Sequence, residues 1–217
     1  MLMTSPRFEL DHLVVAAANL DDGARYIAEQ LGVDIPPGGR HAAMGTHNRV
    51  MQLGSNCYLE VIAVDPVAPH PGRPRWFDLD NPYLRACLNN APRLVTYVVR
   101  GVNGESLTAI DTNMYGEVMP MSRDQLRWQI SIPADGRLPG GGLLPTLLKW
   151  QGDPPVAQMS DTGCRLKTLR VCHDSPDWLK SHLDRLGAGC IVDVVAADGM
   201  PRIEAHIDSP IGSVVLR

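Results

Sequence analysis

The stretch LDHLVVAAANLDDGARYIAEQLG, residues 10–32, decides the fold. It begins with an apolar run that suits a β-strand, in which alternate side chains, His12 among them, share one face. Apolar residues then recur at the spacing of an amphipathic helix. Either Asn19 or Asp21 suits the N-cap of this helix, and Gly32 suits its end. The stretch therefore predicts a strand followed at once by a helix.

The same pattern returns near the other end of the chain, in RLKTLRVCHDSPDWLKSHLDRLG, residues 165–187. Lys167 stands 20 residues before Gly187, just as His12 stands 20 residues before Gly32. The chain thus carries one kind of element twice, with a histidine in one copy and a lysine at the same place in the other. An internal repeat of this kind is interpreted before any motif.

Strand patterns after each helix extend the repeat to units of the order β-α-β-β-β. The first unit covers residues 8–66, a looser second unit covers 94–151, and a third covers 165–217. The proline-rich segment 67–93 between the first two units predicts a linker or a lid. One such unit cannot bury its sheet face alone, whereas two units side by side form a curved sheet around a pocket.

Composition narrows the classes of function. The chain has 217 residues, is 44% hydrophobic and carries a net charge of −4 without a basic cluster, which argues against a nucleic-acid partner. No apolar run approaches the roughly 20 residues of a membrane helix, and the first residues lack the apolar core of a signal peptide. The five cysteines show no CxxC spacing, which favours reduced thiols. These features predict a cytoplasmic protein with a small-molecule partner and no membrane partner.

The repeat resembles the module of the vicinal oxygen chelate superfamily and, more narrowly, the glyoxalase-like domain family. The resemblance lies in the stretches DHLVVAAANLDDGARYIAEQLGV, PGGRHAAMGTHNRVMQLGSNCYLEVIAVDP, VMPMSRDQLRWQISIP and GGGLLPTLLKW. It implies an α+β fold of repeated βαβββ modules, in which curved mixed sheets form a cup. It also implies a metal in the cup, held by a histidine on the first strand and a glutamate on the last strand of a module. In this sequence those positions are His12 and Glu60.

The other two units offer no second pair of ligands. The corresponding positions become Thr96 and Lys149 in the second unit, and Lys167 and Arg217 in the third. Threonine is a poor ligand, and a cation beside a metal ion is repelled by it. Only the first unit therefore retains residues able to hold a metal.

His41 or His47, on or near the next strands of the first unit, would have to complete the site. A set of two histidines and one carboxylate suits a divalent ion such as Zn, Fe, Mn, Ni or Co. The alternative is a barrel-lining His12 that is hydrogen-bonded to Glu60 with no metal at all. Glu60 lies in the apolar run CYLEVIAV, where an unpaired carboxylate is costly, so it is expected in the pocket either as a ligand or as a general base.

Candidate substrate contacts come from two strands. Asn48 and Arg49 alternate along one strand, so one of them faces inward, and we take Asn48. In SRDQLRWQIS, Arg123 or Arg127 could clamp a carboxylate or phosphate, and Trp128 lies beside them. The plainer reading is a surface ion pair for Arg127 and core packing for Trp128, as for Trp76 and Trp150. An aromatic content of 5% argues against a cage of stacked rings.

Two functions remain open at this stage. One is a metal-dependent lyase, isomerase or dioxygenase that stabilises an enolate or similar oxyanion of a small anionic substrate. The other is a metal-free protein that binds or sequesters a small molecule in the same cup. The third unit could in addition mediate homodimerisation through an open sheet edge.

Overall fold

The computed structural model describes residues 7–217 and contains two β-sheets. The larger has eight strands in the order β2-β3-β4-β1-β5-β8-β7-β6. Its first half consists of β1 (Phe8–Ala16), β2 (Pro37–His41), β3 (Thr46–Gln52) and β4 (Tyr58–Val64). Its second half consists of β5 (Arg93–Gly101), β6 (Glu117–Arg123), β7 (Leu126–Ile132) and β8 (Thr146–Trp150).

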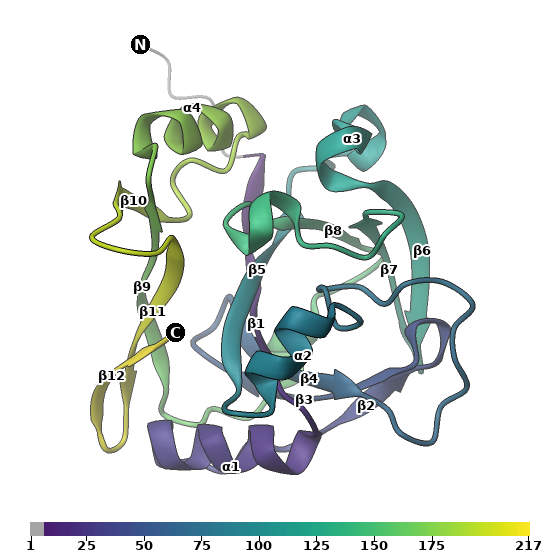
Figure 1. Ribbon diagram of the computed structural model, residues 1–217, viewed down its shortest axis with the longest axis vertical. Helices are drawn as coiled ribbons and strands as arrows, with labels where there is room; N and C mark the ends of the chain where they lie inside the picture. The colour runs from purple at the N-terminus through teal and green to yellow at the C-terminus, as the bar shows by residue number, and fades with distance from the viewer. Residues whose placement is uncertain (1–6) are drawn as a thin grey trace.

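The two halves have the same topology. In each half the first strand runs parallel to the last one, β1 with β4 and β5 with β8. The halves meet where β1 and β5 pair antiparallel. Figure 1 shows β2–β4 and β6–β8 on one side of this central pair. At the two edges of the sheet, Arg123 of β6 lies against Gly39 of β2, so the sheet curls into a cup. The predicted α+β fold with a curved mixed sheet is confirmed.

Helix α1 (Leu20–Leu31) covers the convex face of the sheet. The Asn19 side chain caps it by accepting a hydrogen bond from the Asp22 N–H, and Gly32 ends it in the left-handed region with φ of 69°. Within the helix, a Cβ atom on Gly23 would come within 2.4 Å of Val61 on β4. This glycine therefore permits the close approach of helix and sheet.

The second half is connected by shorter helices. The linker contains α2 (Pro82–Leu88), and the crossover from β5 to β6 contains η2 (Leu107–Ala109) and α3 (Thr112–Tyr115). The remaining 3-10 helices are η1 (Ala42–Met44), η3 (Pro139–Gly142) and η4 (Pro155–Gln158). The crossover thus contains two very short helices rather than one continuous helix.

The last part of the chain forms the four-stranded sheet β10-β9-β11-β12. It consists of β9 (Arg165–His173), α4 (Pro176–Leu186), β10 (Asp193–Ala196), β11 (Arg202–Ser209) and β12 (Gly212–Leu216). Here the first strand is parallel to the second strand, β10, and antiparallel to β11. The segment therefore repeats the order of elements of the first unit but not its strand pairing, and it is not a topological copy of the cup-forming halves.

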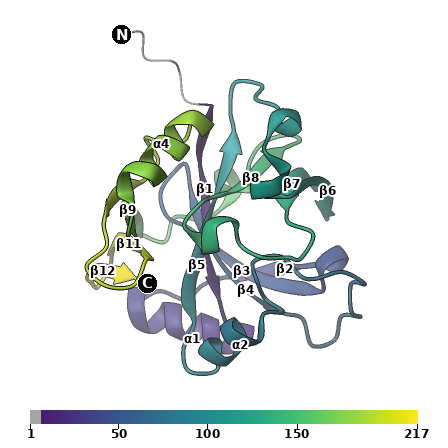
Figure 2. The same ribbon diagram turned by 45° about the horizontal axis from the view of Figure 1, so that its top comes forward.

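Two hydrophobic cores lie on opposite faces of the large sheet. On the convex face, Leu13, Tyr97 and Leu147 pack with α1 and with residues of the small sheet such as Ala205 and Ile207. The small sheet and α4 therefore stand beside β1 and β5, away from the cup (Figures 1 and 2). The concave core contains Val14, Ile62, Trp76, Trp128 and Ile130. Within residues 7–217, no helix combines the length and the apolar character needed to cross a membrane.

Candidate functional site

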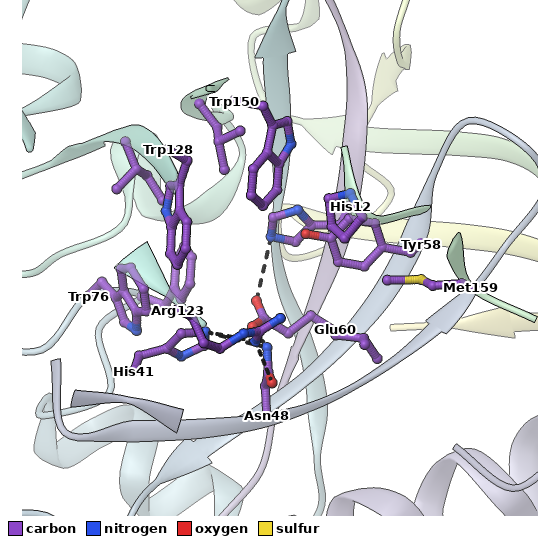
Figure 3. Close-up of a pocket in the computed structure, with 15 residues that line it drawn as sticks. His12, His41, Asn48, Tyr58, Glu60, Trp76, Arg123, Trp128, Trp150 and Met159 are labelled. Atoms are coloured by element: carbon purple, nitrogen blue, oxygen red, sulfur yellow. Dashed lines mark hydrogen bonds and ion pairs between the residues drawn. The ribbon is translucent and has the colours of Figure 1, made fainter. Parts of the chain in front are cut away.

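The cup contains a pocket that is partly open to solvent. Polar side chains from both halves of the sheet line it: His12, His41, Asn48, Glu60 and Arg123. Aromatic side chains form much of the rest: Tyr58, Trp76, Phe77, Trp128 and Trp150. Figure 3 shows the polar group around Glu60, with Trp128 and Trp150 on the other side of the pocket.

A bulge in β1 positions His12. The pairing with β5 skips one residue between Leu10 and His12, so Asp11 and His12 depart from the strict alternation of a strand. The Asp11 carboxylate is fully buried and accepts a hydrogen bond from His12 Nδ1 at 2.7 Å. Its other oxygen accepts from Trp150 Nε1 at 2.7 Å. Asp11 therefore fixes both the imidazole ring of His12 and the indole ring of Trp150.

His12 lies between two carboxylates. Its Nε2 atom is 3.5 Å from Glu60 Oε2, and its ring stacks on Tyr58 with centroids 4.6 Å apart. Burial alone would lower the pKa of His12, but the hydrogen bonds and negative charges of Asp11 and Glu60 outweigh burial and raise this pKa. His12 is therefore an imidazolium at neutral pH.

Glu60 is ionised in the same site. The Asn48 side-chain amide donates to Glu60 Oε1 at 2.6 Å, while His12 faces the other carboxylate oxygen. Burial favours the protonated carboxyl, but the hydrogen bond and charge of His12 reverse this preference and lower the pKa of Glu60. The resting pocket thus holds a buried ion pair rather than a neutral pair.

Arg123 extends this network across the cup. Its Nη1 donates to Asn48 Oδ1 at 2.9 Å, and the same oxygen accepts from the Gly39 N–H at 2.8 Å. These two donors identify the amide oxygen of Asn48, so its NH₂ group must be the one that faces Glu60. The second half of the sheet thereby delivers a cation to the polar group of the first half.

The Nε2 atom of His41 is a hydrogen-bond acceptor. That atom is 3.3 Å from Arg123 Nη1 and 3.5 Å from Asn48 Nδ2, and both of these groups are donors. On the other side of the ring, Nδ1 is 3.1 Å from the hydroxyl oxygen of Thr46. Burial lowers the pKa of His41 to about 4, and the charge of Arg123 acts in the same direction. A neutral ring with hydrogen on Nδ1 satisfies all of these contacts.

The residues present do not form the divalent-metal site expected from the resemblance. His12 and Glu60 lie together, but the lone pair of His41 points at the Arg123 guanidinium, whose charge would repel a metal ion there. Among residues 7–217, no three His, Cys, Asp or Glu side chains are arranged to hold a metal. The donor set is therefore too small for the three or four protein ligands that such an ion takes.

His47 and Arg127 do not reach the pocket. His47 alternates with Asn48 along β3, so it faces the opposite side of the sheet near Arg40 and Arg49. Arg127 is exposed, and its Nη1 donates to the backbone carbonyls of Asp124 and Leu126. The structure therefore brings together His12, His41, Asn48, Glu60, Arg123 and Trp128 from the predicted set, and leaves these two residues outside it.

The positions compared between the units are also placed differently from the expectation. Thr96 is buried and donates to the Gly142 carbonyl, and Leu148 and Trp150, the neighbours of Lys149, face the pocket. In the small sheet, Lys167 pairs with Asp208 and Arg217 with Glu204. Side chains alternate along β8, so Lys149 points away from the cup while its neighbours point into it.

Two features of the site are absent from the sequence-based prediction. Asp11 precedes His12 directly, and only the bulge allows both side chains to serve one site. Trp76, Trp128 and Trp150 come together from a linker and two strands, although the low aromatic content argued against such a cluster. The adjacent pair Asp11–His12 in an apolar strand was the available signal for the first feature.

Comparison with known proteins agrees with the fold. The model of the glyoxalase-like domain family matches residues 10–187. Among solved structures, a hypothetical protein from Staphylococcus aureus is 13% identical with a TM-score of 0.57, covering 96% of this chain and 84% of that one. Methylmalonyl-CoA epimerase from Mycobacterium tuberculosis is 19% identical with a TM-score of 0.42, covering 73% and 97%. The curated proteins contain no match.

Proposed function

Since this chain belongs to the glyoxalase-like domain family, we propose that its cup binds a small, oxygen-rich anion and stabilises an enolate of that molecule. In this proposal the positive charges come from His12 and Arg123 rather than from a divalent metal. The observation that carries it is the buried set Asp11–His12–Glu60, with Arg123 joined to it through Asn48 in one pocket. Buried charges are costly to fold, and strongly perturbed groups in a cleft are typical of functional sites.

The proposed step is a proton transfer. Glu60 takes the proton from a carbon next to the substrate carbonyl, and the electron pair of the broken C–H bond becomes the enolate. Protonation neutralises Glu60 and ends its ion pair with His12. The charge of His12 then acts on the new enolate oxygen through the Nε2 hydrogen, with Arg123 holding the anionic end of the substrate. The proton returns to carbon from Glu60, so the site is restored.

One observation favours a second function, binding without chemistry. Both oxygens of Glu60 are already engaged, by His12 and by the Asn48 amide. A carboxylate held in this way is a weak base, since its pKa is lowered to about 2. A protein that only sequesters a small anion would use the same cup, with Glu60 serving to keep His12 charged.

An exchange experiment separates these functions. The metal content of untagged protein is measured first; the protein is then treated with EDTA, and pyruvate and related 2-oxo acids are incubated with it in D₂O. Deuterium incorporation next to the carbonyl, detected by NMR and lost in Glu60→Gln and His12→Gln, supports the enzyme. Binding of the same acids without deuterium incorporation favours sequestration.

The same experiment can overturn the proposal. Arg123→Gln should abolish anion binding, whereas the exposed Arg127→Gln on the neighbouring strand serves as the matched control. If none of the acids binds, or if both arginine variants bind equally well, the cup is not the anion site. Near one metal ion per chain, lost in both His12→Gln and Glu60→Gln, would instead restore the metal-dependent reaction.

A further inference from the structure

The aromatic side chains of this chain are concentrated at one place. The sequence has four tryptophans and two phenylalanines, and Trp76, Phe77, Trp128 and Trp150 all line the pocket in the cup. The remaining tryptophan, Trp178, is 47% exposed on α4. A polar pocket that needed only to bind a small oxygen-rich anion would not require three indole rings.

Two of the indole rings, those of Trp76 and Trp150, line the pocket with their carbon atoms. Trp76 Nε1 donates to Thr46 Oγ1 at 3.2 Å, and Trp150 Nε1 donates to Asp11 at 2.7 Å. Both N–H groups are thus used by the protein itself. Trp128 and Trp150 are in contact with each other, with ring centroids 5.5 Å apart and planes at 51°. At Trp76 and Trp150 a ligand would therefore meet ring faces and edges rather than indole N–H donors.

The backbone that delivers two of these rings adopts an unfavourable conformation. Phe77 and Asp78 both have positive φ, 57° and 61°, which bulky residues rarely adopt. The turn is held by Asp78 N donating to the Gly136 carbonyl at 2.9 Å, while Phe77 stacks on Trp76 with centroids 5.3 Å apart. The protein maintains this turn at the place where Trp76 and Phe77 meet the cup, as expected of a segment selected for its position in the site.

Arg123 supplies an anchor for a negative charge beside these rings. Its Nη1 is held by Asn48, which leaves its Nε and Nη2 hydrogens for a ligand. Figure 3 shows Arg123 among the polar residues, with Trp128 and Trp150 on the far side of the pocket. A ligand that fits both must carry a carboxylate at one end and a flat apolar group at the other.

We infer that the natural ligand of this pocket is a single-ring aromatic carboxylic acid, with its ring against Trp128 and Trp150 and its carboxylate on Arg123. This inference rests on the proposed anion-binding function and adds the chemistry of the uncharged part. Aromatic pairs prefer offset or edge-to-face contacts, which a saturated ring of the same size cannot reproduce.

A matched pair of acids tests it. Phenylpyruvate and 3-cyclohexylpyruvate differ only in the unsaturation of the ring, and pyruvate lacks the ring altogether. We expect isothermal titration calorimetry to give about tenfold tighter binding of phenylpyruvate than of the cyclohexyl acid. The preference should disappear in Trp128→Leu and persist in Trp178→Leu, with melting temperatures recorded to show that both variants fold.

The outcomes distinguish this inference from the proposed function. If the three acids bind equally well to the wild type, the anion site stands and the aromatic ligand is refuted. If phenylpyruvate is preferred but Trp128→Leu keeps the preference while folded, the ring does not lie where we place it, and the inference also fails. If none of the acids binds, the proposed function itself is refuted.

Discussion

Replacing Asp11 by asparagine is the most informative perturbation of this site. The substitution keeps the shape of the side chain and removes its charge. In the structure one carboxylate accepts from two donors, His12 Nδ1 and Trp150 Nε1, each at 2.7 Å. An amide has a single oxygen, so one of the two donors must then face an NH₂ group.

The size of the effect has two sources. Loss of an adjacent negative charge lowers the pKa of a paired histidine by about 1–3 units, worth roughly 1.4 kcal/mol each. A buried donor left without a partner costs a further 1–3 kcal/mol or so. We therefore expect the Asp11→Asn variant to lose about 2–7 kcal/mol of unfolding free energy at pH 7. The pKa of His12 should fall from its raised value toward the ordinary range.

Urea unfolding and NMR titration of the histidine rings measure the two effects, with His12→Gln used to assign the His12 signal. Glu9→Gln is the control, because Glu9 on the same strand is half exposed and pairs with Arg100, which also lies 3.6 Å from Asp11 Oδ2. Such exposed pairs contribute at most about 1 kcal/mol. If Asp11→Asn costs no more than Glu9→Gln and leaves the His12 titration unchanged, Asp11 does not control the site and the reasoning fails.

Three further predictions follow from individual contacts. Because the pKa of His12 is raised to about 9, its stabilising contribution is complete below pH 6.5 and is lost as pH rises through 9. Over that range the wild type should lose up to about 3 kcal/mol of unfolding free energy, and His12→Gln should not show this loss. Gly116→Ala should lower the free energy of urea unfolding by more than about 2 kcal/mol, since φ is 81° and the new Cβ would lie 2.1 Å from the Ile132 carbonyl carbon. Its control is Gly104→Ala, which has a φ of 78° but open space around it and should cost only the backbone strain of about 1–2 kcal/mol. Arg123→Lys keeps the charge but not the fork geometry, so calorimetry should show anion binding weakened by about tenfold, less than in Arg123→Gln.

The curved sheet could be predicted because its signals are local. Asn19, the apolar stripe of α1 and Gly32 specify one helix between two strands within a short stretch. In the small sheet, local signals predict the order of the elements but not the pairing of the strands. Its elements follow the predicted order, but β9 pairs with β10 and β11, whereas β1 pairs with β4. Strand pairing depends on which apolar faces meet in three dimensions, and element order does not encode it.

The polar half of the site was visible in the sequence for a similar reason. Glu60 interrupts an apolar strand, and a buried carboxylate must have partners. The aromatic half was not visible, because Trp76, Trp128 and Trp150 lie far apart along the chain and join only when the sheet curls. Each of them taken alone is compatible with ordinary core packing.

The two halves of the cup share a topology but contribute different chemistry. The first half provides His12, Asn48 and Glu60, while β7 and β8 of the second half provide Trp128 and Trp150, and Arg123 enters from β6 at the far edge. Burying the ion pair is tolerable because Asp11 and Asn48 satisfy its remaining hydrogen bonds, and Arg123 in turn holds Asn48 in place. The rings surround these charges with apolar atoms, which strengthens the field that the charges exert on a bound anion. If both halves carried the same residues, like charges would meet in the pocket. Because the halves differ, one pocket combines charged side chains from the first half with aromatic side chains from the second.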